Sequence, residues 1–130
     1  MNAFRVSFKT GKLSHRKTLA NVLLPDNIEI DARGMLWVAS LVRNEILTID
    51  PDTGKAATAF RAQTADNDRI AAEWQRRSDA RQPLLELFTP ALWAPLPGPV
   101  TGIILSPGNG PAYVSGLGDG LVKLDPRPQP

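Results

Sequence analysis

The chain has 130 residues, enough for one ordinary domain, and its 42% apolar and 22% charged content is typical of a globular protein. A formal net charge of +2 is too small to indicate a nucleic-acid partner, and no apolar run approaches the roughly 20 residues that cross a bilayer. The absence of cysteine excludes disulfides, thiolate metal sites and cysteine nucleophiles. The N-terminal residues lack the apolar core of a secretory signal, so the location expected by default is cytoplasmic.

The first predicted element is a β-hairpin whose turn contains Thr10, Gly11 and Lys12. Glycine adopts the positive φ that such turns need. His15 lies in the polar strand that follows and is the single histidine of the sequence, so it has no partner for a catalytic dyad and is expected to be exposed. The basic residues of this region lack the interleaved aromatics of a nucleic-acid platform and are expected to form a solvated face. They are Arg5, Lys9, Lys12, Arg16 and Lys17.

Residues 24–40, LPDNIEIDARGMLWVAS, hold the most informative pattern of the chain. A polar turn, Pro25-Asp26-Asn27, leads into a strand in which isoleucines alternate at positions 28 and 30. A tight turn ending at Gly34 leads to a second strand over residues 36–39. The aspartates at positions 31, 50, 52 and 125 are expected to serve hairpin turns. The Asp26-Asn27 pair therefore has oxygen ligands to spare and is the candidate site.

Residues 62–97 interrupt the strand pattern and favour helix. Asp66 or Asp68 is a candidate N-cap for a helix over residues 69–77, in which Ile70 and Trp74 share a face. A second apolar stretch has the spacing of a short amphipathic helix, stopped near Pro90. The segment either folds onto the strands and buries its own leucines, or serves as a lid, a partner surface or a membrane-touching patch.

The chain also repeats itself. Residues 28–31, 37–40 and 44–51 align with residues 103–106, 113–116 and 119–126, with one inserted residue between the first two pieces. A second echo pairs residues 6–12 with residues 49–55 and places two Thr-Gly-Lys turns 43 residues apart. The larger spacing, 75 residues, falls to about 40 once the interrupting segment is removed, which is the length of one four-stranded propeller blade.

Each unit reads as an antiparallel meander of alternating strands separated by Gly or Asn turns. We predict an all-β fold, a partial β-propeller of two to three blades of a six-bladed type, with a short helical insertion. A small sandwich of similar strands is the alternative that the repeat disfavours. The predicted divisions are propeller blades in residues 1–61 (the end of one, then one nearly complete), the helical insertion at 62–97, further blade strands at 98–126 and a tail at 127–130.

Two stretches resemble a known family. The run PDNIEIDARGMLWVAS followed by NEILTIDPDTGK is similar to the SMP-30/gluconolactonase family, in which a P-D-G or D-N-I turn precedes G-x-L-W-V-A. The D-N-I form, and the leucine-rich run LLELFTP with Trp93, resemble its strictosidine-synthase-like and paraoxonase-like branch. The resemblance covers about residues 5–125. It implies the C-terminal half of a six-bladed propeller with one calcium-like metal at the central channel, in families that mostly hydrolyse lactones, aryl esters or organophosphates.

The resemblance also implies roles for Asp26 and Asn27. Both match positions that supply metal ligands in those families, and Asp26 matches the proposed general base of some lactonases. A hard cation such as Ca²⁺ takes six to eight oxygens, of which a carboxylate and an amide carbonyl supply two. Such an ion would polarise a lactone carbonyl or stabilise the developing oxyanion. The repeat places Thr101 and Gly102 at the equivalent positions, so the pair behaves like residues of one central site, although Pro-Asp-Asn is also an ordinary turn sequence.

Length leaves two functional hypotheses. Six blades of about 40 residues need around 250 residues, about twice this chain. The first hypothesis is a calcium-dependent hydrolase acting on a lactone or ester, truncated or split, inactive alone and completed by a second chain or a homo-oligomer. The second is a non-catalytic propeller fragment that serves as a protein-interaction scaffold through its insertion or its unpaired edges. Neither hypothesis calls for a nucleic acid or a membrane span.

Overall fold

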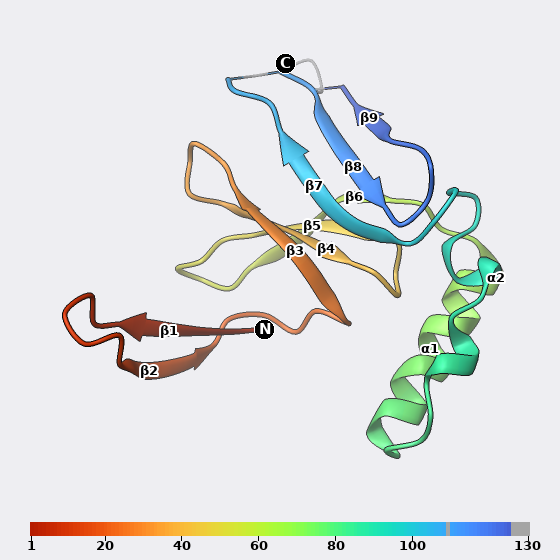
Figure 1. Ribbon diagram of the computed structural model, residues 1–130, viewed down its shortest axis with the longest axis horizontal. Coiled ribbons are helices and arrows are strands. Elements are labelled where there is room, and N and C mark those ends of the chain that lie inside the picture. The colour runs from red at the N-terminus through yellow and green to blue at the C-terminus, as the bar shows by residue number, and fades with distance from the viewer. Residues whose placement is uncertain (109, 126–130) are drawn as a thin grey trace.

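The computed structural model describes residues 1–108 and 110–125, which form nine β-strands, two α-helices and one 3-10 turn (Figure 1). The strands build three antiparallel sheets that follow one another along the chain, in the orders β1-β2, β3-β4-β5-β6 and β7-β8-β9. Residue 109, the predicted strand end at residue 126 and the predicted tail at 127–130 lie outside the described residues.

The first sheet is a hairpin of β1, Asn2–Val6, and β2, Leu13–Thr18. Its turn contains Gly11 with a φ of 69°, the left-handed region that glycine enters at little steric cost. His15 lies in β2 and is exposed, as the sequence predicts. The five basic residues of this region are exposed as well, so the solvated-face prediction is confirmed.

The middle sheet contains four strands, and its two central strands carry buried residues on both faces. The strands are β3 Pro25–Ile30, β4 Leu36–Ser40, β5 Glu45–Ile49 and β6 Ala56–Arg61. Side chains alternate across the sheet because successive Cβ atoms of a strand point to opposite faces. Val38 and Ile49 pack toward the first hairpin, whereas Ala39 and Ile46 pack toward the last sheet.

The last sheet repeats the pairing of the middle one. Its strands are β7 Val100–Leu105, β8 Ala112–Gly116 and β9 Val122–Leu124. Ile28 pairs with Val38 in the middle sheet, and Ile103 pairs with Val114 in the last. The first pairing of each sheet, β3 with β4 and β7 with β8, also contains a register shift near the start of β3 or β7. We call β3 and β7 the inner strands. The repeat seen in the sequence is therefore a repeat of strand register.

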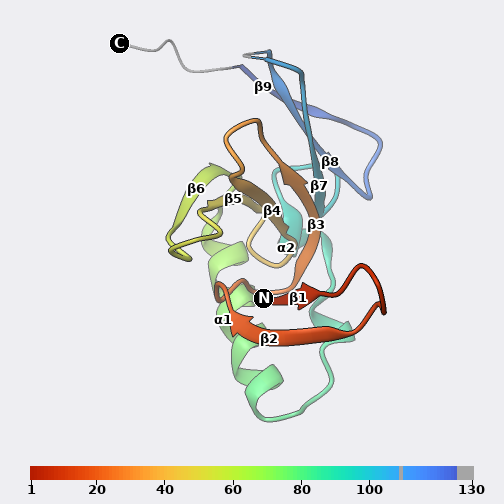
Figure 2. The same cartoon turned by 90° about the vertical axis from the view of Figure 1, so that its left-hand side faces the viewer.

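Each apolar cluster of sheet residues lies between successive sheets. Leu19 and Val22 meet Val38 and Ile49 between the first hairpin and the middle sheet. The middle and last sheets share a second cluster, centred on Ala39, Ile46, Val100, Ile103 and Val114. Figure 2 shows the sheets following one another as separate layers. Consecutive antiparallel meanders joined in this way form an all-β partial propeller with a helical insertion, so the predicted fold class is confirmed.

The insertion contains α1, Ala65–Asp79, a 3-10 turn, Leu85–Leu87, and α2, Pro90–Trp93. The predicted N-cap is wrong: Thr64 caps α1 by accepting from the Asn67 amide, and Asp66 and Asp68 lie in the first turn. The Thr64 hydroxyl reaches the Asn67 amide, as an N-cap side chain does. The carboxylates of Asp66 and Asp68 in the first turn interact favourably with the positive end of the helix dipole. The short helix predicted before Pro90 is a 3-10 turn that ends at Leu87, and Pro90 itself begins α2 at a position where no N–H is needed.

The insertion buries its own apolar residues against the loop between β4 and β5. Ile70, Trp74 and Leu92 form a cluster with Leu41 and Val42, and Leu92 is fully buried. This packing favours the reading in which the segment folds onto the strands. No helix within the described residues is long and apolar enough to span a membrane.

Candidate functional site

The candidate pair lies inside a strand and not in a turn before one, which corrects the sequence reading. Asp26 and Asn27 belong to β3, and the pairing of β3 with β4 jumps from Pro25 opposite Ser40 to Ile28 opposite Val38. The two residues therefore form a β-bulge, a device that re-aims side chains and is common beside active sites. Both residues are exposed. Pro-Asp-Asn has turn propensity, but the register of the apolar positions on either side holds the backbone extended.

Asn27 is held by its own backbone and by the neighbouring sheet. Its Oδ1 accepts from the Ile28 amide at 2.7 Å, which leaves this oxygen one further lone pair. The inner strands β3 and β7 contact each other (Figure 2). A Cβ on Gly102 would lie 3.4 Å from Asn27 Nδ2 and 2.7 Å from Ser115 Oγ. The absence of a side chain at Gly102 thus leaves room for the Asn27 amide against β7. The sequence alone did not predict that Ser115 lies near this point.

The Asp26 carboxylate makes no hydrogen bond or ion pair within residues 1–108 and 110–125. It is a free oxygen donor next to the oriented amide of Asn27, and this donor chemistry suits a hard divalent cation such as Ca²⁺. Among the described residues no group of three or more histidines, cysteines or carboxylates could hold a metal ion. The pair therefore fits part of a calcium site, and further oxygens must join it.

A cleft lies at the other end of β3. Its volume is about 760 Å³, and Ile30, Asp31 and Trp37 line one wall while Leu105 and Pro107 line another. Asp26 and Asn27 do not line it. Trp37 does not lie behind the pair, since it pairs with Glu29 near the far end of the strand. Strand register separates the indole from the bulge.

Asp31 serves the turn, as the sequence predicts. Its carboxylate accepts from the Arg33 and Met35 amides at 2.9 and 3.0 Å and from the Trp37 indole at 3.2 Å. Desolvation acts to raise the pKa of Asp31, but the hydrogen bonds from Trp37, Met35 and Arg33 outweigh it and hold the pKa below its ordinary value. A carboxylate engaged on all sides is a structural group. The same turn chemistry holds for Asp50, which accepts from the Asp52 and Thr53 amides.

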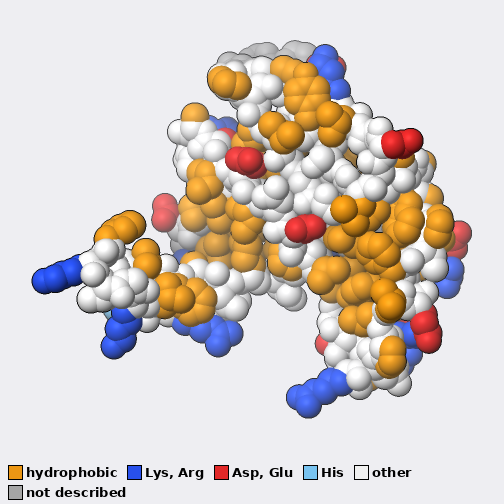
Figure 3. Space-filling model, viewed as in Figure 1, with side chains coloured by type: hydrophobic (Ala, Val, Ile, Leu, Met, Phe, Trp, Pro, Cys, Tyr) orange, Lys and Arg blue, Asp and Glu red, His pale blue; other side chains and the backbone are white. Residues whose placement is uncertain are grey.

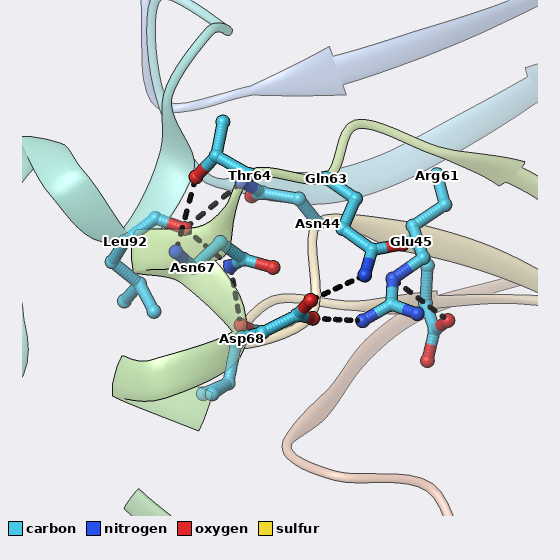
Figure 4. Close-up of polar contacts among 9 residues, drawn as sticks. Asn44, Glu45, Arg61, Gln63, Thr64, Asn67, Asp68 and Leu92 are labelled. Atoms are coloured by element: carbon cyan, nitrogen blue, oxygen red, sulfur yellow. Dashed lines mark hydrogen bonds and ion pairs between the residues drawn. The ribbon is translucent and has the colours of Figure 1, made fainter. Parts of the chain in front are cut away.

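A buried polar cluster fastens the insertion to the middle sheet (Figure 4). Asn44, at the turn between β4 and β5, donates to the Leu92 carbonyl at 2.9 Å. Asn67 of α1 donates to the same carbonyl and to the Val42 carbonyl at 2.6 and 3.0 Å. Both asparagines are fully buried. Sequence reasoning missed them, although Asn67 falls three and seven residues before Ile70 and Trp74, on the buried helical face.

An ion-pair group continues this cluster. Arg61 of β6 lies 2.8 Å from Asp68 of α1 and 3.9 Å from Glu45 of β5. Gln63 donates to the same Asp68 carboxylate. Burial raises the pKa of Glu45, against the positive charges of Arg61 and Arg43 that lower it. The group ties the helix to the two strands, and none of its residues lines the cleft.

Ser40, at the end of β4, is held in a structural hydrogen bond. Ser40 is fully buried and donates to the Leu23 carbonyl at 2.7 Å. His15 contacts Ser14 instead, with 3.0 Å between Nδ1 and the hydroxyl oxygen. The histidine therefore contacts its neighbour in the first hairpin, and the Ser40 hydroxyl is engaged by a backbone carbonyl.

Fold and site together define a class: an arc of a β-propeller with an oxygen-donor pair on an inner strand. No protein-family model matches the chain. Over 59 residues the chain is 42% identical to regucalcin of Xenopus laevis, 41% to that of Danio rerio and 36% to that of Homo sapiens. Each match covers 42% of this chain and only 20% of the regucalcin. These similarities support a relationship to the SMP-30/gluconolactonase family over the matched segment.

Proposed function

We propose that the chain is an arc of a propeller hydrolase of the SMP-30/gluconolactonase type, which acts on lactones or esters and binds Ca²⁺ partly through Asp26 and Asn27. One observation carries the proposal. The bulge at the start of β3 recurs at the start of β7, but carboxylate and amide oxygens occupy it only in β3. The bulge is a feature that the two sheets share, whereas the oxygen donors at positions 26 and 27 are expected in only one place if they serve a single site. The partial similarity to regucalcin supports the same reading.

The chemistry assigned to the pair follows from its exposure and geometry. A bound calcium ion would supply Lewis acidity, polarising the carbonyl of a lactone or ester. The exposed Asp26 carboxylate is the group that would take a proton from an attacking water. The Ile28 amide donates to Asn27 Oδ1 at 2.7 Å and fixes the direction of this oxygen. The role proposed for Asn27 is therefore to hold the ion, and not to transfer a proton.

The site needs donors from outside this arc. Ca²⁺ takes six to eight oxygens, and the bulge provides two side chains. A second chain, or further copies of this one, would complete both the ring and the coordination sphere. We therefore expect the isolated chain to be inactive, or active only when concentrated enough to assemble. The six-bladed ring and the strictosidine-synthase-like branch remain part of this proposal.

The test is hydrolysis of a sugar lactone and of an aryl acetate, followed by pH-stat over a range of chain concentrations. The proposal expects turnover that needs Ca²⁺, rises faster than linearly with chain concentration and disappears in Asp26→Ala. Asp52→Ala is the matched control, because Asp52 is an exposed aspartate at a hairpin turn. Turnover that is unchanged in Asp26→Ala would contradict the proposal.

A scaffold without catalysis is the second candidate. It is favoured by apolar side chains left exposed on the first hairpin, among them Phe8, which is 99% exposed, and Leu13, which is 59% exposed. Absence of turnover at every concentration, together with specific capture of another polypeptide by this hairpin, would favour the scaffold.

A further inference from the structure

The cleft at the far end of β3 lies between two sheets of the same chain. Figure 1 and Figure 2 both show the turn between β3 and β4 beside the connection between β7 and β8. The cleft is lined by side chains from both sheets that pack against the buried cluster beneath them: Trp37, Ala59, Leu105, Ala112 and Leu124. Its floor is therefore apolar, and the shared core holds its two walls together.

The size of this cleft suits a small organic molecule. Small-molecule sites have volumes of roughly 300–1,000 Å³ and are mostly apolar with a few placed polar groups. The cleft, at about 760 Å³, falls within that range. Figure 3 shows apolar side chains gathered at the end of the last sheet where β7 leads into β8. Because Asp26 and Asn27 do not line the cleft, a ligand bound here occupies a second site.

One carboxylate holds an aromatic ring and a cation on the same wall. Asp31 Oδ2 accepts from the Trp37 indole N–H at 3.2 Å and from the Arg33 guanidinium at 3.1 Å. Its Oδ1 accepts from the Arg33 and Met35 amides, which fixes the carboxylate within the turn. The Arg33 side chain itself is 77% exposed. The indole and the guanidinium are thus oriented before a ligand arrives, which lowers the entropy cost of binding.

Charge in the cleft favours an anionic ligand. Both carboxylates that line it already have cationic partners, since Asp31 pairs with Arg33 at 3.1 Å and Asp125 pairs with Lys123 at 2.6 Å. A guanidinium has five N–H donors, and within the described residues that of Arg33 donates one hydrogen bond, to Asp31. The other donors have the fork geometry that matches a carboxylate.

We propose that this cleft binds a small aromatic carboxylate, whose ring packs between Trp37 and Leu105 and whose carboxylate accepts hydrogen bonds from Arg33. A ring against the indole gains more than its buried area alone, because aromatic pairs attract each other in offset and edge-to-face arrangements. A hydrogen bond between two charged groups is stronger than a neutral one, which selects the carboxylate over an uncharged group. The inference goes beyond the proposed function, because neither member of the candidate calcium pair takes part in it.

The test uses probes that share one ring and differ in charge: 2-naphthoate, 2-naphthamide and 2-naphthylmethylammonium. Each is titrated into the full chain without calcium, and the indole N–H signals of Trp37, Trp74 and Trp93 are followed by NMR. The expected result is a saturable shift of the Trp37 signal, with 2-naphthoate bound about three- to tenfold more tightly than the amide. Equal binding of the amide, tighter binding of the ammonium, or shifts confined to the other two indoles would overturn the proposal.

The arginine has a matched pair of variants. Arg33→Gln should weaken 2-naphthoate binding about three- to tenfold and leave binding of the amide unchanged, because it removes the charge and the fork of donors. Arg16→Gln alters an exposed arginine of β2 that does not line the cleft, and it should retain the wild-type affinity for both probes. The same affinity for 2-naphthoate in Arg33→Gln as in the wild type would contradict the assigned role.

The indole is tested by shape. Trp37→Leu removes the aromatic face and should weaken binding of both 2-naphthoate and the amide at least about fivefold. Trp37→Phe keeps a ring without the N–H that Asp31 accepts, and should weaken binding only about two- to threefold. Circular dichroism checks that each variant is folded. Equal affinities in a folded Trp37→Leu and in the wild type would overturn the proposal.

The same titration is run on Asp26→Ala. Retained binding of 2-naphthoate in a chain that no longer binds Ca²⁺ supports the cleft proposal, whatever the outcome for the metal site. Binding of 2-naphthoate that Asp26→Ala abolishes would assign the probe to the bulge and overturn the cleft proposal.

Discussion

The middle and last sheets share one pattern of strand pairing, but the side chains at equivalent positions differ in burial and in chemical type. Their inner strands β3 and β7 carry the same bulge and pair with the next strand in the same register. Ile103 of β7 is 1% exposed, whereas its counterpart Ile28 in β3 is 44% exposed. Asp26 and Asn27 occupy the bulge in one sheet and Thr101 and Gly102 in the other. Backbone geometry thus belongs to the repeat, and chemistry belongs to single positions within it.

Truncation of the two isoleucines should give the largest contrast. Ile103→Ala removes a fully packed side chain between two sheets and should lower the free energy of unfolding by about 2–5 kcal/mol. Ile28→Ala should lower it by less than about 1 kcal/mol, because the side chain is half exposed. Urea denaturation of both variants measures the difference. Equal losses would mean that the inner strand of the middle sheet is covered in solution.

The turns between the second and third strands provide the next contrast. Asn44→Ala removes the bond to the Leu92 carbonyl and places alanine at a φ of 48°, so we expect a loss of about 1–2 kcal/mol. Asp119 occupies the equivalent turn of the last sheet and is exposed, so Asp119→Ala should change stability by at most about 0.5 kcal/mol. Thermal unfolding by circular dichroism compares the two. A larger loss in Asp119→Ala would contradict the assignment of the anchoring role to Asn44.

The glycine in the β7 bulge tests whether the two inner strands are coupled. Gly102→Ala brings a Cβ to 2.7 Å from Ser115 Oγ and 3.4 Å from Asn27 Nδ2, and should cost about 1 kcal/mol. Ser115→Ala in the same chain removes the closer clash and should recover most of that loss. A double-mutant cycle gives the coupling energy. Full additivity would show that the glycine is not needed for this contact.

Glu45 makes the stability of the middle sheet depend on pH. Its folded-state pKa lies above the ordinary 4.5, so the folded chain holds this proton more tightly than the unfolded chain. The resulting stabilisation is present below pH 4.5 and is lost as the pH rises through the folded pKa. Glu45→Gln should flatten that decline by a few tenths of a kcal/mol, measured by urea denaturation at several pH values. An unchanged decline would assign it to another group.

The repeated order of strands and turns could be predicted from the sequence, whereas the contacts between distant segments could not. The repeat predicted that residues 28–51 and 103–126 follow one strand plan, and the structure gives both the same pairing register. A one-residue slip would turn every apolar side chain to the wrong face. The same constraint overrode the turn propensity of Pro25-Asp26-Asn27 and kept it extended. Thr64 as the cap of α1, and the buried Asn44 and Asn67, depend on contacts between segments far apart in the chain. Such contacts leave no periodic signal in one sequence.

The candidate site was readable only in part. The donors at positions 26 and 27 stood out because the repeat does not share them. That Asn27 lies against Gly102, and that Trp37 lines a cleft at the opposite end of the strand, follow from sheet pairing and the approach of β7. The places of Asn27 and Trp37 relative to their neighbours could be known only from the folded sheets.

The most direct test of the central claim is calorimetric titration of the chain with Ca²⁺, beside Asp26→Ala and the control Asp52→Ala. Asp26→Ala should leave stability within about 0.5 kcal/mol, because the side chain is exposed and unpaired among the described residues. The account predicts calcium binding that Asp26→Ala abolishes and Asp52→Ala retains, strengthening as the chain is concentrated. Binding that is the same in all three proteins, or absent from all three at every chain concentration, would contradict a calcium site at the β3 bulge.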